Sequence, residues 1–139
     1  MNWLLPALLS AIFAAATAIL AKIGVRDINS NLATGIRTII ILLFAWGIIA
    51  AQGAYKGIQN ISAYTFVFLV ASGITTGLSW LFYFRALQLG SATHVAPIDK
   101  LSLVFTIVLA AIILREKMSF LVILGTVFMS IGAVLISLG

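Results

Sequence analysis

The sequence has no cysteine, one histidine and three acidic residues among its 139 positions. The absence of cysteine excludes disulfides and thiol chemistry, and a single histidine cannot assemble a metal site. Charged residues make up 8% of the chain, whereas about a quarter is usual in a soluble domain. An ordinary water-facing surface cannot be built from this composition. A soluble enzyme, a disordered segment and a nucleic-acid-binding protein are therefore excluded.

Hydrophobic residues make up 63% of the chain and gather in five long stretches. Each stretch reaches the roughly 20 residues that a helix needs to cross a bilayer, and all are too long and continuous for barrel strands. No Lys or Arg precedes the first stretch, which favours a retained span over a cleaved signal peptide. We predict an all-α membrane protein, a single five-span unit over residues 1–139. The spans are expected at about 3–23, 32–51, 63–87, 93–114 and 120–138.

The basic residues are divided almost evenly between the two sides of the predicted membrane. The side of the N-terminus carries Lys56, Arg115 and Lys117, and the other side carries Lys22, Arg26, Arg37 and Arg85. The orientation of a membrane protein follows the excess of Lys and Arg on the cytoplasmic side. An excess of one residue barely favours either orientation. Two interpretations stay open on charge alone. The chain has a single orientation, or copies insert both ways up and pair as an antiparallel homodimer.

A polar stripe runs along the third predicted span. Its members are Ser72, Thr76, Ser79 and Tyr83, spaced four, three and four residues apart, with Trp80 next to it. This spacing places them on one helical face. The hydroxyls either bond back to their own helix or form the wall of a hydrated cavity. In the second case the stripe contacts substrate, with Trp80 and Tyr83 supplying aromatic surface.

The fourth predicted span contains Pro97, Asp99 and Lys100. Charges inside a span are costly and usually face a cavity or a partner. Neighbouring positions diverge by about 100° on a helix, so we expect the two charges to need a further partner. The two charges form either a structural ion pair near the helix end, with Lys100 extending to the membrane surface, or a functional site. In the second case Asp99 could take up a proton and Lys100 could attract an anionic group. Pro97 either breaks the helix near the cavity or, if the span begins near Ala96, simply starts it.

Small residues recur every seven positions in the last span, at Gly125, Gly132 and Gly139. Such a strip lets another helix approach closely. It could pack inside the chain, but because this helix is terminal we interpret Gly125 and Gly132 as a dimer contact.

The third and fourth spans together suggest a family. The residues Arg85-Ala86-Leu87, Gly90, Ala92, Pro97-Ile98 and the closing run from Ile113 to Glu116 resemble the EamA unit of the drug/metabolite transporter superfamily. Most members have ten spans as two inverted five-span units, so the resemblance implies half of such a transporter. The chain is also similar in size to the small multidrug-resistance proteins, which act as antiparallel dimers. The resemblance thus favours a ten-helix inverted-repeat homodimer.

Some residues depart from these families. The small multidrug-resistance proteins carry a membrane Glu in the first span, and this chain has no acid there, so their chemistry does not transfer. Arg115 stands where the EamA pattern often has Gly before its closing Glu. The superfamily carries amino acids, sugars, nucleotide sugars, drugs and lipid-linked sugars, and membership alone does not choose among them.

We therefore predict a transporter of small metabolites or drugs in the cell (inner, cytoplasmic) membrane, working by alternating access. The expected partners are membrane lipids, a second copy of the chain and a small-molecule substrate, with no nucleic acid. No cofactor, metal or catalytic residue is expected, because nucleophile–base pairs, metal clusters and phosphate loops are missing from the sequence. The alternatives are a lipid or lipid-linked sugar flippase and a non-transporting subunit of a larger complex.

Overall fold

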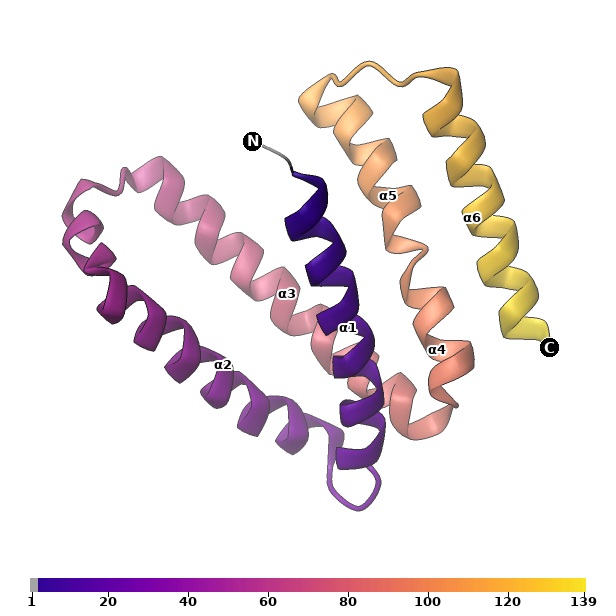
Figure 1. The fold of residues 1–139 in the computed structure, drawn as a ribbon, viewed down its shortest axis with the longest axis horizontal. Helices are drawn as coiled ribbons and strands as arrows, with labels where there is room; N and C mark the ends of the chain where they lie inside the picture. Colours follow the sequence, from indigo (N-terminus) through magenta and orange to yellow (C-terminus); the bar gives the residue numbers. More distant parts are fainter. Residues whose placement is uncertain (1–2) are drawn as a thin grey trace. The chain divides into compact units, whose positions relative to one another are not determined.

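The computed structural model describes residues 3–139, which are helical apart from short connections (Figure 1). Five segments are long and apolar enough to cross a membrane, which confirms the predicted spans. The first three are α1 (Leu4–Gly24), α2 (Ser30–Gln52) and α3 (Ala63–Leu89), and a 3₁₀ helix, Ala54–Asn60, joins α2 to α3. The fourth consists of α4 (Ala92–Asp99), α5 (Ser102–Leu109) and a π-helical turn, Ala110–Leu114. The fifth is α6 (Phe120–Leu138).

Polar side chains at the connections fix where the helices begin. The Asn29 side chain accepts hydrogen bonds from the backbone N–H groups of Asn31 and Leu32 at the start of α2. Ser91 and Ser119 cap α4 and α6 in the same way. Each cap satisfies an N–H that the helix itself leaves without a partner. Gly53 ends α2 with a left-handed backbone, φ +68°.

The chain divides into two compact units. One consists of α1 up to Lys22 together with residues 89–139, and in it α6 packs mainly against α4. The Lys22 Nζ donates to the Gly90 carbonyl at 2.7 Å, which ties the end of α1 to the turn before α4. The other unit is residues 23–88, in which α3 runs in the opposite direction to α2 (Figure 1) and contacts it where α2 begins and α3 ends.

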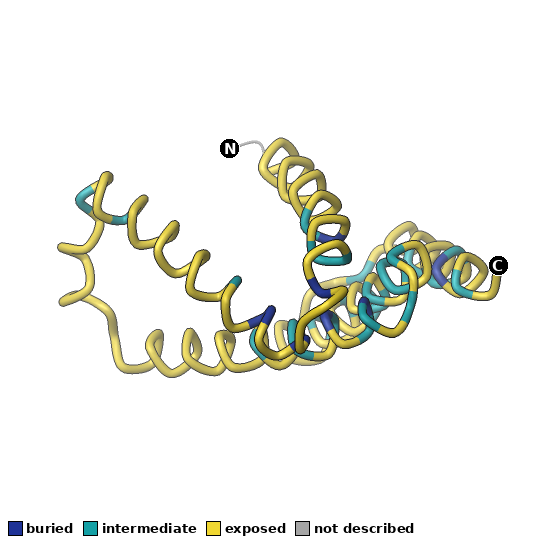
Figure 2. The backbone as a smooth tube through the Cα atoms, turned by 90° about the horizontal axis from the view of Figure 1, so that it is seen from below, coloured by how far each residue is buried: buried dark blue, intermediate teal, exposed yellow. Residues whose placement is uncertain are grey.

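Most side chains on the five spans are exposed, as the yellow tube in Figure 2 shows. In the most apolar 18-residue stretch of each span, at most 11% of the residues are buried within the chain. In the second unit the buried residues gather where the start of α2 meets the end of α3; they are Val25, Ser30, Ala33, Thr34, Phe84 and Leu87. The remaining apolar surface suits lipid or another protein rather than water.

The fourth span is interrupted in its middle. Ser91 caps α4 and the helix starts at Ala92, so Pro97 lies in its second turn and does not begin it. The helix continues through Pro97 to Asp99, and the break follows at Lys100 and Leu101. There the backbone forms short-range bonds, from Lys100 N to Pro97 O at 3.1 Å and from Leu101 N to Ile98 O at 3.0 Å. Pro97 therefore does not start the helix, and its role in the break stays a prediction.

The turn after the fourth span places a large side chain in a backbone conformation that favours glycine. Arg115 has φ +55° and ψ +33°, and it is the one residue other than glycine with positive φ in the part of the chain described. An L-residue with a Cβ is strained in this region. The sequence position where the family often has Gly is therefore also a position where the backbone favours Gly.

We expect Arg115→Gly to raise the free energy of unfolding by about 1 kcal/mol, because it removes the Cβ strain. Thermal unfolding in detergent would measure this as a higher midpoint. Arg115→Gln is the matched control, since it removes the charge and keeps the Cβ. Equal midpoints for the Gly and Gln variants would contradict the strain at Arg115.

Candidate functional site

The helix break in the fourth span holds a pair of opposite charges. Lys100 Nζ donates to Asp99 Oδ2 at 3.3 Å, which makes the two an ion pair. The long Lys100 side chain folds back to its neighbour, and the further partner expected for the two charges stays a prediction. The pair remains accessible, with 53% of the Lys100 side chain and 35% of the Asp99 side chain exposed.

A small cavity adjoins this break. It has a volume of about 140 Å³ and is lined from the fourth span by Lys100 and its apolar neighbours, and from α6 by Thr126, Met129 and Ser130. The hydroxyls of Thr126 and Ser130 bond back to their own helix, at 2.7 and 2.8 Å. Lys100 is therefore the charged residue among those that line this cavity.

The polar stripe of α3 is exposed along most of its length. Ser72, Thr76 and Ser79 are exposed, and Trp80 and Tyr83 are half-buried. The Thr76 hydroxyl donates to the Ser72 carbonyl at 2.8 Å, so at this position the back-bonded alternative holds. Substrate contact by the stripe stays a prediction.

Arg37 forms a cluster with aromatic residues that the sequence analysis did not identify. Its guanidinium carbon lies 4.4 Å from the centroid of the Trp80 ring and 5.1 Å from that of Phe84. Arg37 is the eighth residue of α2, and Trp80 and Phe84 are one turn apart on α3, so an antiparallel hairpin brings them together. Arg37 was expected among the basic residues that flank the spans, whereas the structure places it two turns inside a span. The four-residue spacing of Trp80 and Phe84 was the available signal.

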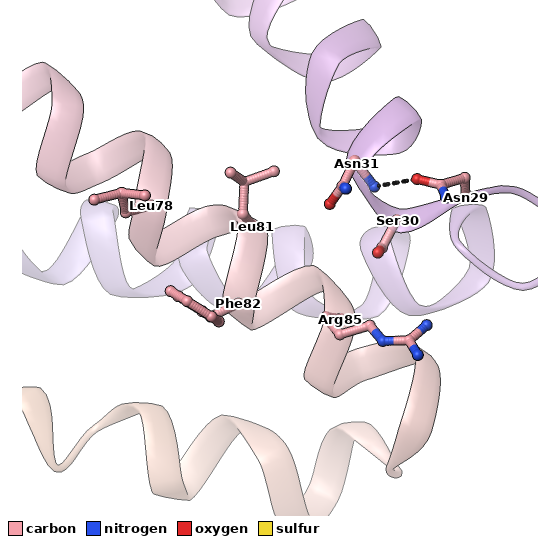
Figure 3. A pocket seen from close by; sticks show the side chains of 7 residues that line it. All are labelled: Asn29, Ser30, Asn31, Leu78, Leu81, Phe82 and Arg85. Carbon is pink, nitrogen blue, oxygen red and sulfur yellow. Dashed lines mark hydrogen bonds between the residues drawn. The ribbon is translucent and has the colours of Figure 1, made fainter.

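The same unit contains an open groove (Figure 3). Its volume is about 510 Å³. The walls are formed by the start of α2, at Asn29, Ser30 and Asn31, and by a ridge of α3, at Leu78, Leu81, Phe82 and Arg85. Arg85 is exposed and donates to the Gln88 side-chain oxygen at 3.2 Å.

Gln88 connects this end of α3 to the loop before α2. Its side-chain nitrogen donates to the carbonyls of Val25, at 2.9 Å, and Ile28, at 2.6 Å. The loop carbonyls are thereby satisfied by a side chain, as partly buried backbone groups require. Gln88 thus positions both Arg85 and the loop that leads into α2.

The glycines Gly125 and Gly132 of α6 border open space. A Cβ added at Gly125 or Gly132 would meet nothing within 4 Å. Each lies about 100° round the helix from the next residue, Thr126 or the buried Ala133. Packing of α6 within its unit therefore does not require these two glycines. Their role as a dimer contact stays a prediction.

Comparison with known families matches residues 1–138 to the EamA-like transporter family. The chain is also similar to a protein of Sinorhizobium sp. named "uncharacterized transporter in cobO 3'region". The two are 48% identical over 136 residues, which is 98% of this chain and 96% of that protein. No solved structure gives a significant match to the chain.

Proposed function

The chain belongs to the EamA-like transporter family, and from that premise we propose that it carries small metabolites or drugs by alternating access as an antiparallel homodimer. Five apolar spans make it a multi-pass membrane protein. We place it in the cytoplasmic membrane of the cell. The family and the chemistry of the spans both point to transport rather than catalysis.

The observation that carries the mechanism is the interrupted fourth span. Asp99 and Lys100 lie directly at the break, next to a cavity. Transporters place substrate and coupling ions at discontinuous helices, because an interrupted helix exposes backbone dipoles that can bind charge. A carboxylate at the break can exchange a proton, and an ammonium beside it can hold the counter-charge. We therefore assign proton coupling to Asp99, with Lys100 as its partner.

The antiparallel dimer is supported by the balance of basic residues. Arg37 lies on aromatic rings two turns inside α2 and is removed from the count of flanking charges, whereas Lys22 and Arg85 lie within about one turn of a span end and stay in it. Each side then carries three basic residues. They are Lys56, Arg115 and Lys117 on the side of the N-terminus, and Lys22, Arg26 and Arg85 on the other. A balanced count gives no preferred orientation, and two inverted copies of a five-span chain form an inverted repeat.

We expect Asp99→Asn to abolish stimulation of transport by a pH gradient, because the amide cannot take up a proton. The measurement is uptake into liposomes containing the full chain, with and without the gradient, over a panel of amino acids, sugars, organic acids and quaternary amines. Glu116→Gln is the matched control, since it neutralises an exposed acid in the loop before α6. Gradient-driven uptake that is unchanged in Asp99→Asn would remove Asp99 from the coupling step.

A second candidate, flipping of a lipid or a lipid-linked sugar, is supported by a separate observation. An open apolar groove of about 300 Å³ runs between the end of the fourth span and α6. It is lined by aliphatic side chains and Met118 together with Thr126, a surface that suits an acyl chain. Transbilayer movement of a fluorescent lipid in the same liposomes separates this candidate from metabolite uptake. If neither occurs and the chain co-purifies with another membrane protein, it acts instead as a non-transporting subunit.

A further inference from the structure

The charges within the five spans are strongly biased toward one sign. Four basic residues and one acidic residue lie inside them; they are Lys22, Arg37, Arg85, Lys100 and Asp99. The single acid is already paired with Lys100. A cation in a span is costly unless something compensates it. The spans of one chain therefore hold positive charge that their own carboxylates cannot neutralise.

In the second unit, Arg37 lies farther from the nearest helix end than Arg85 does. Its guanidinium also lies against aromatic rings. The seven residues before it in α2 place it about 10 Å along the helix axis from Ser30. Its guanidinium contacts the rings of Trp80 and Phe84. Among the described residues no carboxylate forms an ion pair with it.

Aromatic contacts occupy a different part of the guanidinium from the part that binds anions. A ring attracts the cation through its negative face, which stabilises the charge at depth. The N–H groups project from the edge of the planar guanidinium, and their fork matches the two oxygens of a carboxylate or phosphate. Trp80 and Phe84 can therefore hold Arg37 in place while its donors remain available to an oxyanion. A lysine at this position would still bind the aromatic rings through its charge, but it would lack the paired N–H donors that match two oxygens of an anion.

On this geometry, and resting on the proposed transport function, we propose that the substrate is an organic anion whose carboxylate or phosphate binds Arg37. The anion supplies the charge that the spans lack, and it pairs with a guanidinium at membrane depth, where such pairs are strong. Asp99 is not needed for this step, because it already has a basic neighbour. The two charged sites then have separate roles, with Arg37 in substrate binding and Asp99 in coupling.

Trp80 offers a direct optical test, because it lies against the cation in question. Replacing Trp3 and Trp46 with Phe leaves Trp80 as the single tryptophan. The full chain in nanodiscs is titrated at constant ionic strength with butyrate, its isosteric neutral amide butyramide, butylammonium and inorganic phosphate. We expect a saturable change in fluorescence with butyrate or phosphate and none with the neutral or cationic probe. The two anions distinguish a carboxylate substrate from a phosphorylated one.

Variants at Arg37 connect the signal to its guanidinium. Arg37→Gln is expected to raise the apparent Kd at least about tenfold, the loss typical of a hydrogen bond to a charged group. Arg37→Lys keeps the charge and the ring contact, so it should fold and bind with intermediate affinity. Arg26→Gln removes the same charge from a loop and should leave the Kd unchanged. Saturable binding of butyramide or butylammonium, or equal Kd values for wild type and both Arg37 variants, would overturn the proposal.

Uptake of the same four probes separates this inference from the proposed function. Protein-dependent flux of butylammonium or butyramide alone would uphold transport and overturn the anionic substrate. Anion-specific binding at Trp80, without protein-dependent flux of any solute, would uphold the site and overturn the transport function. Flux of butyrate or phosphate that Arg37→Gln reduces would support both.

Discussion

Two variants with opposite charge bias, each inactive alone, will restore transport when they are expressed together. The first is Lys56→Ala with Lys117→Ala, which leaves one basic residue on the side of the N-terminus against three on the other. The second is Arg26→Ala with Gln52→Lys, which gives four against two. Orientation follows the cytoplasmic excess of Lys and Arg, so the two variants should insert in opposite directions. Neither alone can then form an antiparallel dimer, and the mixture can.

The measurement combines orientation and flux. A C-terminal reporter pair, one active inside and one active outside, should report both sides for the wild type. It should place the C-terminus inside the cell for the first variant and outside for the second. Uptake is followed with any solute that the wild type carries. Lys56→Arg with Lys117→Arg is the control, since it changes both residues without changing the count.

Two results would exclude the antiparallel homodimer. One is a wild-type reporter that is active on a single side of the membrane. The other is full activity of either biased variant by itself, since copies inserted in one direction would then suffice. In both cases the pairing of α6 through Gly125 and Gly132 would have to be parallel or involve a different protein.

The spans could be predicted from the sequence because bilayer thickness sets their length and lipid permits few polar residues in them. Span boundaries predicted at 63 and 120 agree with α3 and α6, and the Asn- and Ser-rich connections supply the caps. The start of α2 was placed at Leu32, whereas Asn29 caps it and the helix begins at Ser30. Local capping chemistry therefore refined what hydropathy alone had located.

The site was less predictable because its contacts join residues far apart in the chain. Pro97 identified the fourth span as irregular, but the helix tolerates the proline and breaks only at Lys100. Arg37 looked like a flanking charge, since a basic residue near a helix end normally extends to the membrane surface. Its position became clear only when the hairpin brought Trp80 and Phe84 beside it. Periodicity within one helix cannot show which neighbour that helix has.

Pro97→Ala is expected to stabilise the chain and to slow transport. Proline in a helix interior has no N–H for the carbonyl four residues earlier, here that of Thr93, and its ring strains the turn, at a cost of about 3 kcal/mol. Alanine restores the bond and favours one continuous helix from Ala92 to Leu114. We expect the free energy of unfolding to rise by about 1–3 kcal/mol. Transport should fall about tenfold or more if alternating access bends the span at Lys100 and Leu101, since a site that must flex loses function when stiffened.

The chain provides its own control for this substitution. Pro6, the other proline, is the third residue of α1, where a backbone N–H has no helical partner in any case. Pro6→Ala should therefore leave both the unfolding midpoint and the flux nearly unchanged. If Pro97→Ala raises the midpoint and transport stays at the wild-type rate, the break does not bend during the cycle. Asp99 and Lys100 would then act at a fixed interruption, and the movement that alternates access would have to occur between helices rather than within the fourth span.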